Sequence, residues 1–570
     1  MDDYIRRYND WCTNDYFDED TKAELRRIAD DEKEIKERFY KNLTFGTAGL
    51  RGIIGAGTNR MNIYSVRKAT QGLANYIISL GEKKRGVAIC YDSRHMSREF
   101  AKETALCLAA NGIKAYVFDD LRPTPELSFA VRELGCIAGV TITASHNPPE
   151  YNGYKVYWED GAQITTPHDK GIMAEVQNVE NETAVKTMSH EDAVASGLYV
   201  LIGQAIDDAY ISKLKELVLR QDAIRAESKN LKIVYTPLHG SGNVLARKIL
   251  KELGFEQVYV VKEQEFPDGD FPTVPSPNPE VEGAFTLALE LAKEVDADFI
   301  LATDPDADRI GVRVKDEEGI YHDFTGNMSG ALLAEYELSQ LKELGRIPKD
   351  GYLLKSIVTT NLGNAIAKSY GVGCKESLTG FKYIGKQMRV FEETGEGTFV
   401  FGFEESYGSL LGTYARDKDA VAATMAICEA AAYYRTKGMS LWDAMIAMYE
   451  KYGYYKEGVK SFTMKGIEGL EKIQNIIQSL RKEPPSEVGE YKVEKIRDYK
   501  NGEIKDLPKA NVLYYELSDD AWIAIRPSGT EPKIKFYYGI KGTSLADADA
   551  KAADIGKEVL AMVENVLDKG

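Results

Sequence analysis

Short apolar runs and amphipathic segments alternate along most of the chain, and one arrangement of them occurs three times. Each copy has an apolar strand, a polar loop, a helix that ends near a glycine, and a second strand. The first strands of the three copies are Val87–Tyr91, Lys232–Tyr235 and Leu353–Val358. Helices placed between strands in this way are typical of parallel sheets. The pattern therefore predicts an α/β protein with three related domains and mixed, largely parallel sheets.

The pattern changes after Tyr454. Two strand-like segments, Ala521–Arg526 and Lys533–Ile540, precede a long amphipathic segment at Ser544–Leu567, which predicts a smaller C-terminal α+β domain. Near the start of the chain, the charged segment Thr21–Tyr40 is predicted to form one amphipathic helix. The predicted domains are 1–205, which includes this N-terminal extension, 206–323, 324–453 and 454–570.

Composition is ordinary for a globular protein and narrows the range of partners. The chain has 570 residues, of which 44% are hydrophobic and 28% charged, and a formal net charge of −17. Such an acidic protein does not fit a nucleic-acid partner, which requires a basic surface, although a local basic loop can still bind a small anion. The six cysteines are scattered and include no C-x-x-C pair, which is typical of buried thiols in a reducing compartment.

No segment is predicted to enter a membrane. The chain begins Met1-Asp2-Asp3-Tyr4 and has no apolar signal core there. The longest apolar run, Ala420–Tyr434, is interrupted by Glu429 and is too short to span a bilayer. We therefore expect a cytoplasmic protein that acts on a small molecule.

Ser145 lies at the end of an apolar run and is followed by turn residues, and Lys155 lies at the start of the next strand-like run. A serine held on a rigid loop near a cation can accept and return a phosphoryl group. One alternative is a hydrolase nucleophile paired with His146. Against it, neighbouring side chains on an extended segment point to opposite faces, and Thr143 and Asn147 replace the glycines of the nucleophile elbow. The other alternative is an ordinary surface turn.

Three aspartates, Asp304, Asp306 and Asp308, follow the apolar strand Phe299–Thr303. On an extended loop these carboxylates point to one side, and they repel one another unless a cation intervenes. Their hard oxygens suit Mg²⁺, whereas an EF-hand would need glycine where Arg309 stands. Arg309 fits instead as a counter-charge for a site that holds anions. A solvated acidic turn and the aspartyl-phosphate site of haloacid-dehalogenase-type phosphotransferases are the alternatives, although the third aspartate favours metal binding over the latter.

Two glycine-containing segments have the residues of a phosphate site. Arg526–Pro532 lies between two predicted strands and combines a guanidinium and two hydroxyls with the backbone N–H groups around Gly529. Phe45–Gly52 offers three glycines and Arg51, which is a weaker indication of the same chemistry. The alternatives are an ordinary turn for the first segment and a glycine-rich hairpin for the second.

Two further loops contain groups that can contact a substrate. Gly380–Gln387 falls one residue short of a nucleotide-binding P-loop and ends in a residue without the metal-binding hydroxyl, so an ATPase is not expected, but Lys382 can still contact a substrate. Phe401–Gly408 places two carboxylates, one of them Glu404, and the Ser406 hydroxyl between glycines. Carboxylates accept hydrogen bonds from sugar hydroxyls well, although a solvated acidic turn is an equal alternative.

Together and in this order, the motifs resemble those of the α-D-phosphohexomutase family over residues 41–570. Thr-Ala-Ser-His-Asn-Pro resembles the phosphoserine loop, Asp-Pro-Asp-Ala-Asp-Arg the Mg²⁺ loop, Glu-Glu-Ser the sugar-binding loop and Arg-Pro-Ser-Gly-Thr the distal phosphate loop. Pro305 and Ala307 replace the usual glycines of the Mg²⁺ loop, and Phe403 stands where many members have glycine. The resemblance implies four domains around a central cleft, the last one mobile.

The resemblance also implies roles at the reacting phosphate. Ser145 would carry the phosphoryl group and, with the three aspartates, complete a Mg²⁺ site. Arg51 and Lys155 would balance charge, with Lys155 a candidate general acid or base, and His146 occupies the position of an active-site histidine. The residues implied for binding the sugar and its other phosphate are Lys382, Glu404, Ser406, Arg526, Ser528, Gly529, Thr530 and Arg309.

The implied reaction interconverts glucose 1-phosphate and glucose 6-phosphate. Phospho-Ser145 would form glucose 1,6-bisphosphate and then take back the other phosphate, with Mg²⁺ and the bisphosphate as cofactors. Two loops are most similar to the branch with bacterial enzymes and phosphopentomutase-like relatives. Mannose phosphate, pentose phosphate and net synthesis of glucose 1,6-bisphosphate remain alternatives, as does a sugar-phosphate-binding regulator on an inactive scaffold. A monomer or weak dimer is expected.

Overall fold

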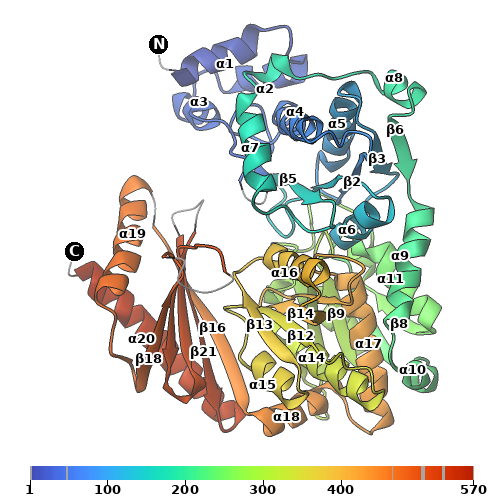
Figure 1. Cartoon of the computed structure of the whole chain (residues 1–570), viewed down its shortest axis with the longest axis vertical. Helices are drawn as coiled ribbons and strands as arrows, with labels where there is room; N and C mark the ends of the chain where they lie inside the picture. The colour runs from blue at the N-terminus through green and yellow to red at the C-terminus, as the bar shows by residue number, and fades with distance from the viewer. Residues whose placement is uncertain (1–2, 47–48, 465, 502–506, 529–532, 569–570) are drawn as a thin grey trace. The chain divides into compact units, whose positions relative to one another are not determined.

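The structure, a computed structural model, describes residues 3–46, 49–464, 466–501, 507–528 and 533–568. The chain forms two compact units, each assembled from segments that are separate in the sequence (Figure 1). The first unit consists of Met1–Asp323, Gly385–Thr394 and Gly408–Thr436. The second consists of Phe324–Ile384, Gly395–Tyr407 and Lys437–Gly570.

The first unit contains a six-stranded sheet in the order β1-β5-β4-β2-β3-β6. Its strands are β1 (Leu50–Ile53), β2 (Val87–Tyr91), β3 (Ala115–Phe118), β4 (Ala138–Ile142), β5 (Tyr151–Trp158) and β6 (Tyr199–Ile202). Strand β2 is parallel to β3 and β4, whereas β5 runs antiparallel to β4 and β1. Every residue of β2 and β4 is buried, as expected for central strands of a sheet whose faces are both covered.

Helices follow the strands of this sheet as the sequence pattern predicted. They are α4 (Ile63–Ser79), α5 (Ser97–Ala110), α6 (Thr124–Glu133), α7 (His168–Asn178) and α8 (His190–Ala195). The apolar side chains of α4 and α5 pack with those of β2 and β4 in one core, which includes Leu73, Phe100, Ile89 and Val140. This packing holds the loops that follow β2 and β4 in fixed positions.

A second sheet of the first unit has the order β11-β10-β9-β7-β8. Its strands are β7 (Lys232–Thr236), β8 (Gln257–Val260), β9 (Phe299–Thr303), β10 (Ile310–Lys315) and β11 (Tyr321–Phe324). Strand β7 is parallel to β8 and β9, and β10 returns antiparallel to β9. The helices of this part of the chain are α9 (Gln204–Glu216), α10 (Gln221–Glu227), α11 (Gly242–Leu253), α12 (Lys262–Glu265) and α13 (Thr286–Val295). Helix α17 (Ala420–Thr436) and the short strand β15 (Gly408–Leu411) also belong to the first unit.

The N-terminal extension forms three helices, α1 (Asp3–Thr13), α2 (Glu19–Arg27) and α3 (Glu32–Phe39). The prediction of one helix over Thr21–Tyr40 is wrong. Asp31 accepts the backbone N–H of Glu34 at 3.0 Å and so caps the start of α3, and aspartate prefers such a position to a helix interior. The three helices bury a cluster of aromatic side chains against α4, among them Trp11, Phe39 and Tyr64.

The second unit contains two sheets. The strands β12 (Gly351–Ser356), β13 (Gly373–Ser377) and β14 (Thr398–Glu404) are parallel, with β12 in the middle. Their helices are α14 (Gly326–Glu343), α15 (Leu362–Ser369), α18 (Leu441–Tyr452) and α16 (Phe381–Thr394), which continues into the first unit. The third strand–helix–strand prediction is therefore confirmed.

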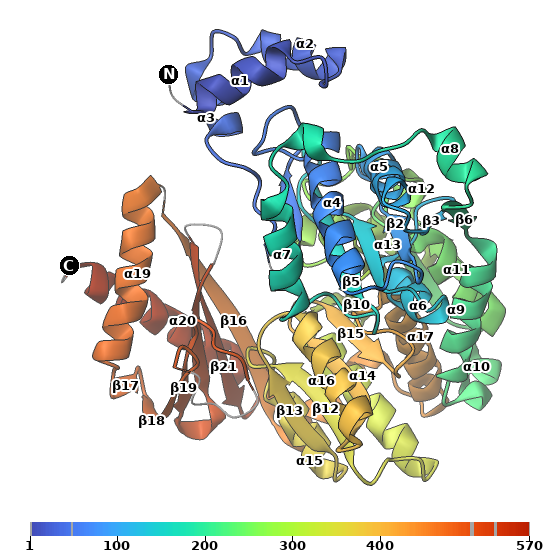
Figure 2. The same cartoon turned by 45° about the horizontal axis from the view of Figure 1, so that its top comes forward.

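The C-terminal part of the second unit is an antiparallel sheet in the order β16-β21-β20-β19-β18-β17. Its elements are β16 (Tyr454–Thr463), α19 (Gly466–Lys482), β17 (Glu487–Val488), β18 (Tyr491–Asp498), β19 (Leu513–Leu517), β20 (Trp522–Pro527), β21 (Lys533–Gly542) and α20 (Leu545–Asp568). Helices α19 and α20 lie beside this sheet (Figure 2) and share its apolar core. The predicted C-terminal α+β arrangement is confirmed.

None of the helices in the described part of the chain is both long enough and apolar enough to cross a membrane.

Candidate active site

Ser145 lies in the loop that follows β4, with a φ of 53°. A non-glycine residue adopts this left-handed conformation only where surrounding contacts hold it. Its backbone N–H donates to Thr143 Oγ1 at 2.7 Å. The fully buried guanidinium of Arg94 holds the rest of the loop by donating to backbone carbonyls. These are the carbonyls of Ser145, Asn147, Pro148 and Tyr151.

The Ser145 hydroxyl lies between two partners. Its Oγ donates to Asp304 Oδ2 at 2.9 Å and lies 3.1 Å from His146 Nδ1. The prediction that the Ser145 and His146 side chains point apart is wrong, because it assumed an extended backbone. Since the hydroxyl proton is directed at Asp304, His146 Nδ1 donates to Oγ and is not placed to remove that proton. Burial, together with the charges of Arg309 and Arg51, lowers the pKa of His146 to about 2, so its imidazole is neutral.

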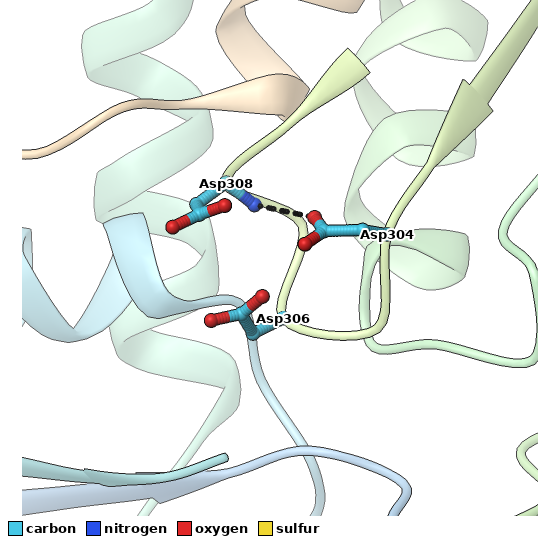
Figure 3. A group of neighbouring side chains, drawn as sticks. All are labelled: Asp304, Asp306 and Asp308. Carbon is cyan, nitrogen blue, oxygen red and sulfur yellow. Dashed lines mark hydrogen bonds between the residues drawn. The ribbon is translucent and has the colours of Figure 1, made fainter. Parts of the chain in front are cut away.

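The three aspartates of the loop after β9 converge, and their side chains point toward one another (Figure 3). Ligand atoms of Asp304, Asp306 and Asp308 lie within 4.8 Å of one another, and all three residues are buried. Asp304 Oδ1 accepts the backbone N–H groups of Asp308 and Arg309, each at 3.1 Å. The backbone therefore wraps around the Asp304 carboxylate and fixes the other two beside it.

Two lysines accompany the aspartates. Lys155 Nζ lies 2.8 Å from Asp306 Oδ2, and Lys418 Nζ lies 2.9 Å from Asp308 Oδ2. Burial raises the pKa of Asp304 well above its usual range, and the charges of Asp306 and Asp308 raise it further. Burial also opposes ionisation of Asp306, but the Lys155 ammonium brings the pKa of that carboxyl below its usual range.

The cluster has the features of a cation site. Oδ1 of Asp306 and Oδ1 of Asp308 are buried, and neither accepts a hydrogen bond within the described part of the chain. Buried polar atoms normally have a partner, and clustered carboxylate oxygens are the usual ligands of Mg²⁺ and Ca²⁺. The residues present therefore fit a divalent cation.

Sequence reasoning missed Lys418. It lies in the charged segment Arg416–Asp419, directly before α17, and the backbone N–H of Ala420 donates to the Ala307 carbonyl at 3.1 Å. Lys418 also lies 3.1 Å from Asp417, which accepts the Tyr157 hydroxyl at 2.6 Å. A run of four charged residues before an apolar helix was the available signal.

Arg94 and Thr124 were also missed. The Thr124 backbone N–H donates to the Asp306 carbonyl at 2.9 Å, and its hydroxyl donates to Asp306 Oδ2 at 3.2 Å. Arg94 follows β2 and Thr124 follows β3. The loops after the carboxyl ends of parallel strands are where α/β sheets build their sites, and this placement could have singled out both residues.

Arg51 and Arg309 are the two predicted arginines of the first unit whose charges act on His146. Arg51 is exposed on β1, opposite Gly153 of β5, and Thr47 and Ala48 of its glycine-rich segment lie outside the described residues. Arg309 pairs with Glu280 and lies 3.7 Å from Asp308 Oδ1.

The predicted sugar-binding residues lie in the second unit. Glu404 ends β14, is buried, and accepts the backbone N–H of Gly380 at 2.7 Å. This contact joins Glu404 to the loop before α16, the helix whose second residue is Lys382. Ser406 lies in the turn that follows β14 and is partly exposed.

Arg526 and Ser528 also lie in the second unit. The Arg526 side chain is exposed on β20, and the Ser528 backbone N–H donates to the Lys533 carbonyl at 2.7 Å. Gly529 and Thr530 lie outside the described residues.

Three family models match the chain. They describe phosphoglucomutase/phosphomannomutase α/β/α domain I at residues 42–183, domain II at 208–319 and domain III at 325–452. A phosphoglucomutase of Staphylococcus aureus (strain MRSA252) is 36% identical over 559 residues, which cover 96% of this chain and 97% of that protein. The chain belongs to the phosphoglucomutase/phosphomannomutase family. The membership of the α-D-phosphohexomutase family that the motifs indicated is thus confirmed.

Further relatives of this family agree in length and fold. A phosphoglucomutase of Staphylococcus epidermidis (strain ATCC 35984) is 39% identical over 518 residues, covering 89% of this chain and 92% of that protein. The solved structure of Paramecium pp63/parafusin, a phosphoglucomutase in an open form, has a TM-score of 0.70 at 19% identity, covering 92% of this chain and 95% of that one. A family protein of Burkholderia thailandensis has a TM-score of 0.65 at 20% identity, covering 92% and 98%. These two structures share the fold.

Proposed function

We propose that the protein is a phosphoglucomutase that interconverts glucose 1-phosphate and glucose 6-phosphate. The observation that carries the proposal is the buried Ser145 hydroxyl, 2.9 Å from one of three clustered aspartates. A serine in this setting can exchange a phosphoryl group beside a cation, and Lys155 can balance the charge that moves. Similarity to staphylococcal phosphoglucomutases over nearly the whole chain supports glucose as the sugar.

We assign the cation site to Mg²⁺. Its ligands would be Asp304, Asp306 and Asp308 together with an oxygen of the phosphate on Ser145. The Oδ1 atoms of Asp306 and Asp308, which accept no hydrogen bond from the residues that the structure describes, support this assignment, as does the preference of Mg²⁺ for carboxylate and phosphate oxygens. When bound, the ion would neutralise negative charge on the phosphoryl group during transfer.

The reaction consists of two phosphoryl transfers. In the first, the 6-hydroxyl oxygen of glucose 1-phosphate bonds to phosphorus and the bond from phosphorus to Ser145 Oγ breaks. Lys155, our candidate general acid and base, would give its ammonium proton to the departing Oγ and take up the proton of the sugar hydroxyl. The product, glucose 1,6-bisphosphate, turns around, and its 1-phosphate returns to Ser145 to leave glucose 6-phosphate. The same bisphosphate can recharge a serine that has lost its phosphate, so it would act as an activator.

Other residues would bind the substrate. Arg51 and Arg309 would hold charge near the reacting phosphate, beside the neutral imidazole of His146. Groups of the second unit would hold the sugar and its other phosphate. They are Lys382, Glu404, Ser406, Arg526, Ser528, Gly529 and Thr530. The carboxylate of Glu404 suits sugar hydroxyls, and the guanidinium of Arg526 suits a phosphate.

Turnover by a Ser145→Ala variant tests the proposal. We expect mutase activity to be lost, while the sugar phosphate still binds, because only the phosphoryl acceptor is removed. Ser79→Ala, which changes an exposed serine at the end of α4, is the matched control and should turn over normally. Rates of the wild-type protein on glucose, mannose and ribose 1-phosphates compare the possible sugars. Retained turnover in Ser145→Ala would refute the nucleophile, and a faster rate on mannose or ribose phosphate would refute glucose as the sugar.

A further inference from the structure

Residues 266–280, here called the strap, connect α12 to the next helical turn without forming a helix or strand of their own. In the sequence, the strap lies between strands β8 and β9 of the second sheet. It nevertheless contacts the loops that follow β2 and β4 of the first sheet. These contacts are made by Asp270, Phe271 and Ser276. None of them is required to complete either sheet.

The middle of the strap covers Arg94. The Phe271 ring lies 5.0 Å from the Arg94 guanidinium, and Phe271 is 1% exposed. Phe271 has a φ of 46°, a conformation that a bulky residue adopts only where its surroundings hold it. Because Arg94 donates to four carbonyls of the serine loop, including that of Ser145, the ring shields from water the hydrogen bonds that shape this loop.

Two polar contacts fix the strap to the same loops. Ser276 Oγ donates to the backbone carbonyl of His146 at 3.0 Å, one residue after the nucleophile. Asp270 Oδ1 lies 2.7 Å from His95 Nε2, in the loop after β2. The strap therefore touches the serine loop directly and also through Arg94.

The base of the strap is fixed by a buried histidine, His239. Its Nδ1 lies 3.1 Å from the Phe266 carbonyl and its Nε2 lies 2.9 Å from Thr273 Oγ1. Because a carbonyl oxygen can only accept, Nδ1 carries the proton given to the Phe266 carbonyl, and Nε2 can accept the hydroxyl of Thr273, whose Oγ1 accepts the Gln264 amide at 3.0 Å. The His239 imidazole thus links Phe266 and Thr273 of the strap.

The loop that carries His239 also supports the loop after β9, which carries the three aspartates. The backbone N–H and the hydroxyl of Ser241 both donate to the Pro305 carbonyl, at 2.9 and 2.8 Å. A Cβ on Gly240 would come within 2.6 Å of Pro305 Cα, so only glycine permits this approach. The strap is therefore anchored beside the aspartates at one end and bound to the serine loop along its length, with Glu280 paired to Arg309 at its other end.

We propose that the strap positions the phosphoserine loop and keeps water from phospho-Ser145, with Ser276 and Phe271 as its positioning residues. This inference rests on the proposed phosphoserine function and extends it. The reaction to be prevented is hydrolysis: a water oxygen bonds to phosphorus, the bond to Ser145 Oγ breaks, and a water proton passes to the serine oxygen as inorganic phosphate leaves. Transfer to sugar differs only in the attacking oxygen, so a mutase must exclude water while it holds the phosphoryl group.

The test compares loss of phosphate to water with transfer to sugar. Wild-type, Ser276→Ala, Ser276→Thr and Phe271→Leu proteins are charged with glucose 1,6-bisphosphate and Mg²⁺, separated from both, and followed by intact-mass spectrometry. Mutase turnover and melting temperature are measured on the same samples. We expect Ser276→Ala and Phe271→Leu to lose phosphate about tenfold faster than wild type, the effect of one lost hydrogen bond or ring contact, with a smaller fall in turnover. Ser276→Thr keeps the hydroxyl and should match wild type.

The outcomes separate this inference from the function on which it rests. A raised ratio of hydrolysis to transfer in the two variants, restored in Ser276→Thr, supports the strap's role, because a general loss of stability would lower both rates alike. Equal hydrolysis rates in all four proteins, with phosphate on Ser145, would overturn the strap proposal and leave the phosphoserine function standing. Absence of phosphate from wild-type Ser145 would overturn both.

Discussion

At the scale of single residues, Lys418 shows how charge is distributed around the aspartates. Its ammonium lies between Asp308 and Asp417, at 2.9 and 3.1 Å. Lys155 holds Asp306 in the same way on the other side of the cluster. Each lysine both stabilises a buried carboxylate and competes with a cation for it, so the two functions can be separated by mutation.

Lys418→Met should lower kcat while it strengthens Mg²⁺ binding. The loss of one fixed cation near the transferring phosphoryl group should reduce kcat by about a hundredfold. The Asp308 carboxylate would then be free of its ion pair, so the Mg²⁺ concentration for half-maximal activity should fall. Steady-state rates over a Mg²⁺ titration measure both quantities. Lys213→Met removes an exposed lysine of α9 that pairs with Glu216 on the surface and should change neither. Weaker Mg²⁺ binding in Lys418→Met would contradict this account.

The site residues could be predicted where chemistry and spacing together are specific. Three aspartates after an apolar strand indicated a cation site, and their side chains do converge. The contact between Ser145 and His146 could not be predicted, because it depends on a left-handed φ that the tertiary contacts of Arg94 impose. Lys418 was missed because it is more than a hundred residues away in the sequence from the aspartate that it contacts.

At the scale of elements, the strands and helices of the three α/β repeats followed from periodicity, since a buried strand such as β9 must be apolar on both faces. The helices of the N-terminal extension could not be predicted from periodicity. Its charged residues fit a helix at every position, but α2 ends at Arg27 and Asp31 caps the start of a new helix, α3. Packing decides whether such a side chain lies inside a helix or caps one, and local sequence patterns do not reveal that packing.

The loop between β9 and β10 makes stability depend on pH and Mg²⁺. The pKa of Asp304 is raised in the folded protein. A raised carboxyl pKa contributes stability that is full below about pH 4 and is lost as the pH rises through the folded value. Without metal, wild-type protein should therefore lose melting temperature relative to Asp304→Asn as the pH rises above about 4.

Saturating Mg²⁺ should reverse this trend, because a bound cation favours the carboxylate and displaces its proton. Thermal scans of wild type and Asp304→Asn in EDTA and in Mg²⁺, over the same pH series, measure the effect. Taking the difference between the two proteins removes the contribution of other buried acids, such as Glu126, whose pKa is also raised by burial. A difference that is independent of pH in EDTA would contradict the electrostatic description of the loop.

At the scale of the whole molecule, the family could be predicted from four motifs in order, and the α/β class with a C-terminal α+β part from the pattern of strands and helices. The division into four domains, the oligomeric state and the cytoplasmic location remain predictions. The structure contains two compact units, and between residues 385 and 436 the chain passes from one to the other more than once. Gly385–Thr394 and Gly408–Thr436 belong to the first unit, and Gly395–Tyr407 belongs to the second. Which segments join in one unit depends on contacts between distant parts of the chain, and local sequence patterns do not predict those contacts.

Within the second unit, the two sheets are joined by an apolar cluster that no sequence pattern predicted. Trp522 and Tyr514 of the C-terminal sheet pack with Ile357 and Leu378 of the parallel-sheet part. The ion pair of Arg497 with Glu376, at 2.7 Å, crosses the same boundary. The residues proposed to bind the sugar and those proposed to bind its other phosphate therefore belong to one packed unit.

The central claim is that Ser145 carries the phosphoryl group. The most direct measurement is to incubate the purified protein with Mg²⁺ and glucose 1,6-bisphosphate and to locate phosphate by intact-mass and peptide-mapping spectrometry. We predict one phosphate, on Ser145. An unmodified Ser145, or a phosphate on Asp304, would contradict the account and favour an aspartyl-phosphate enzyme instead.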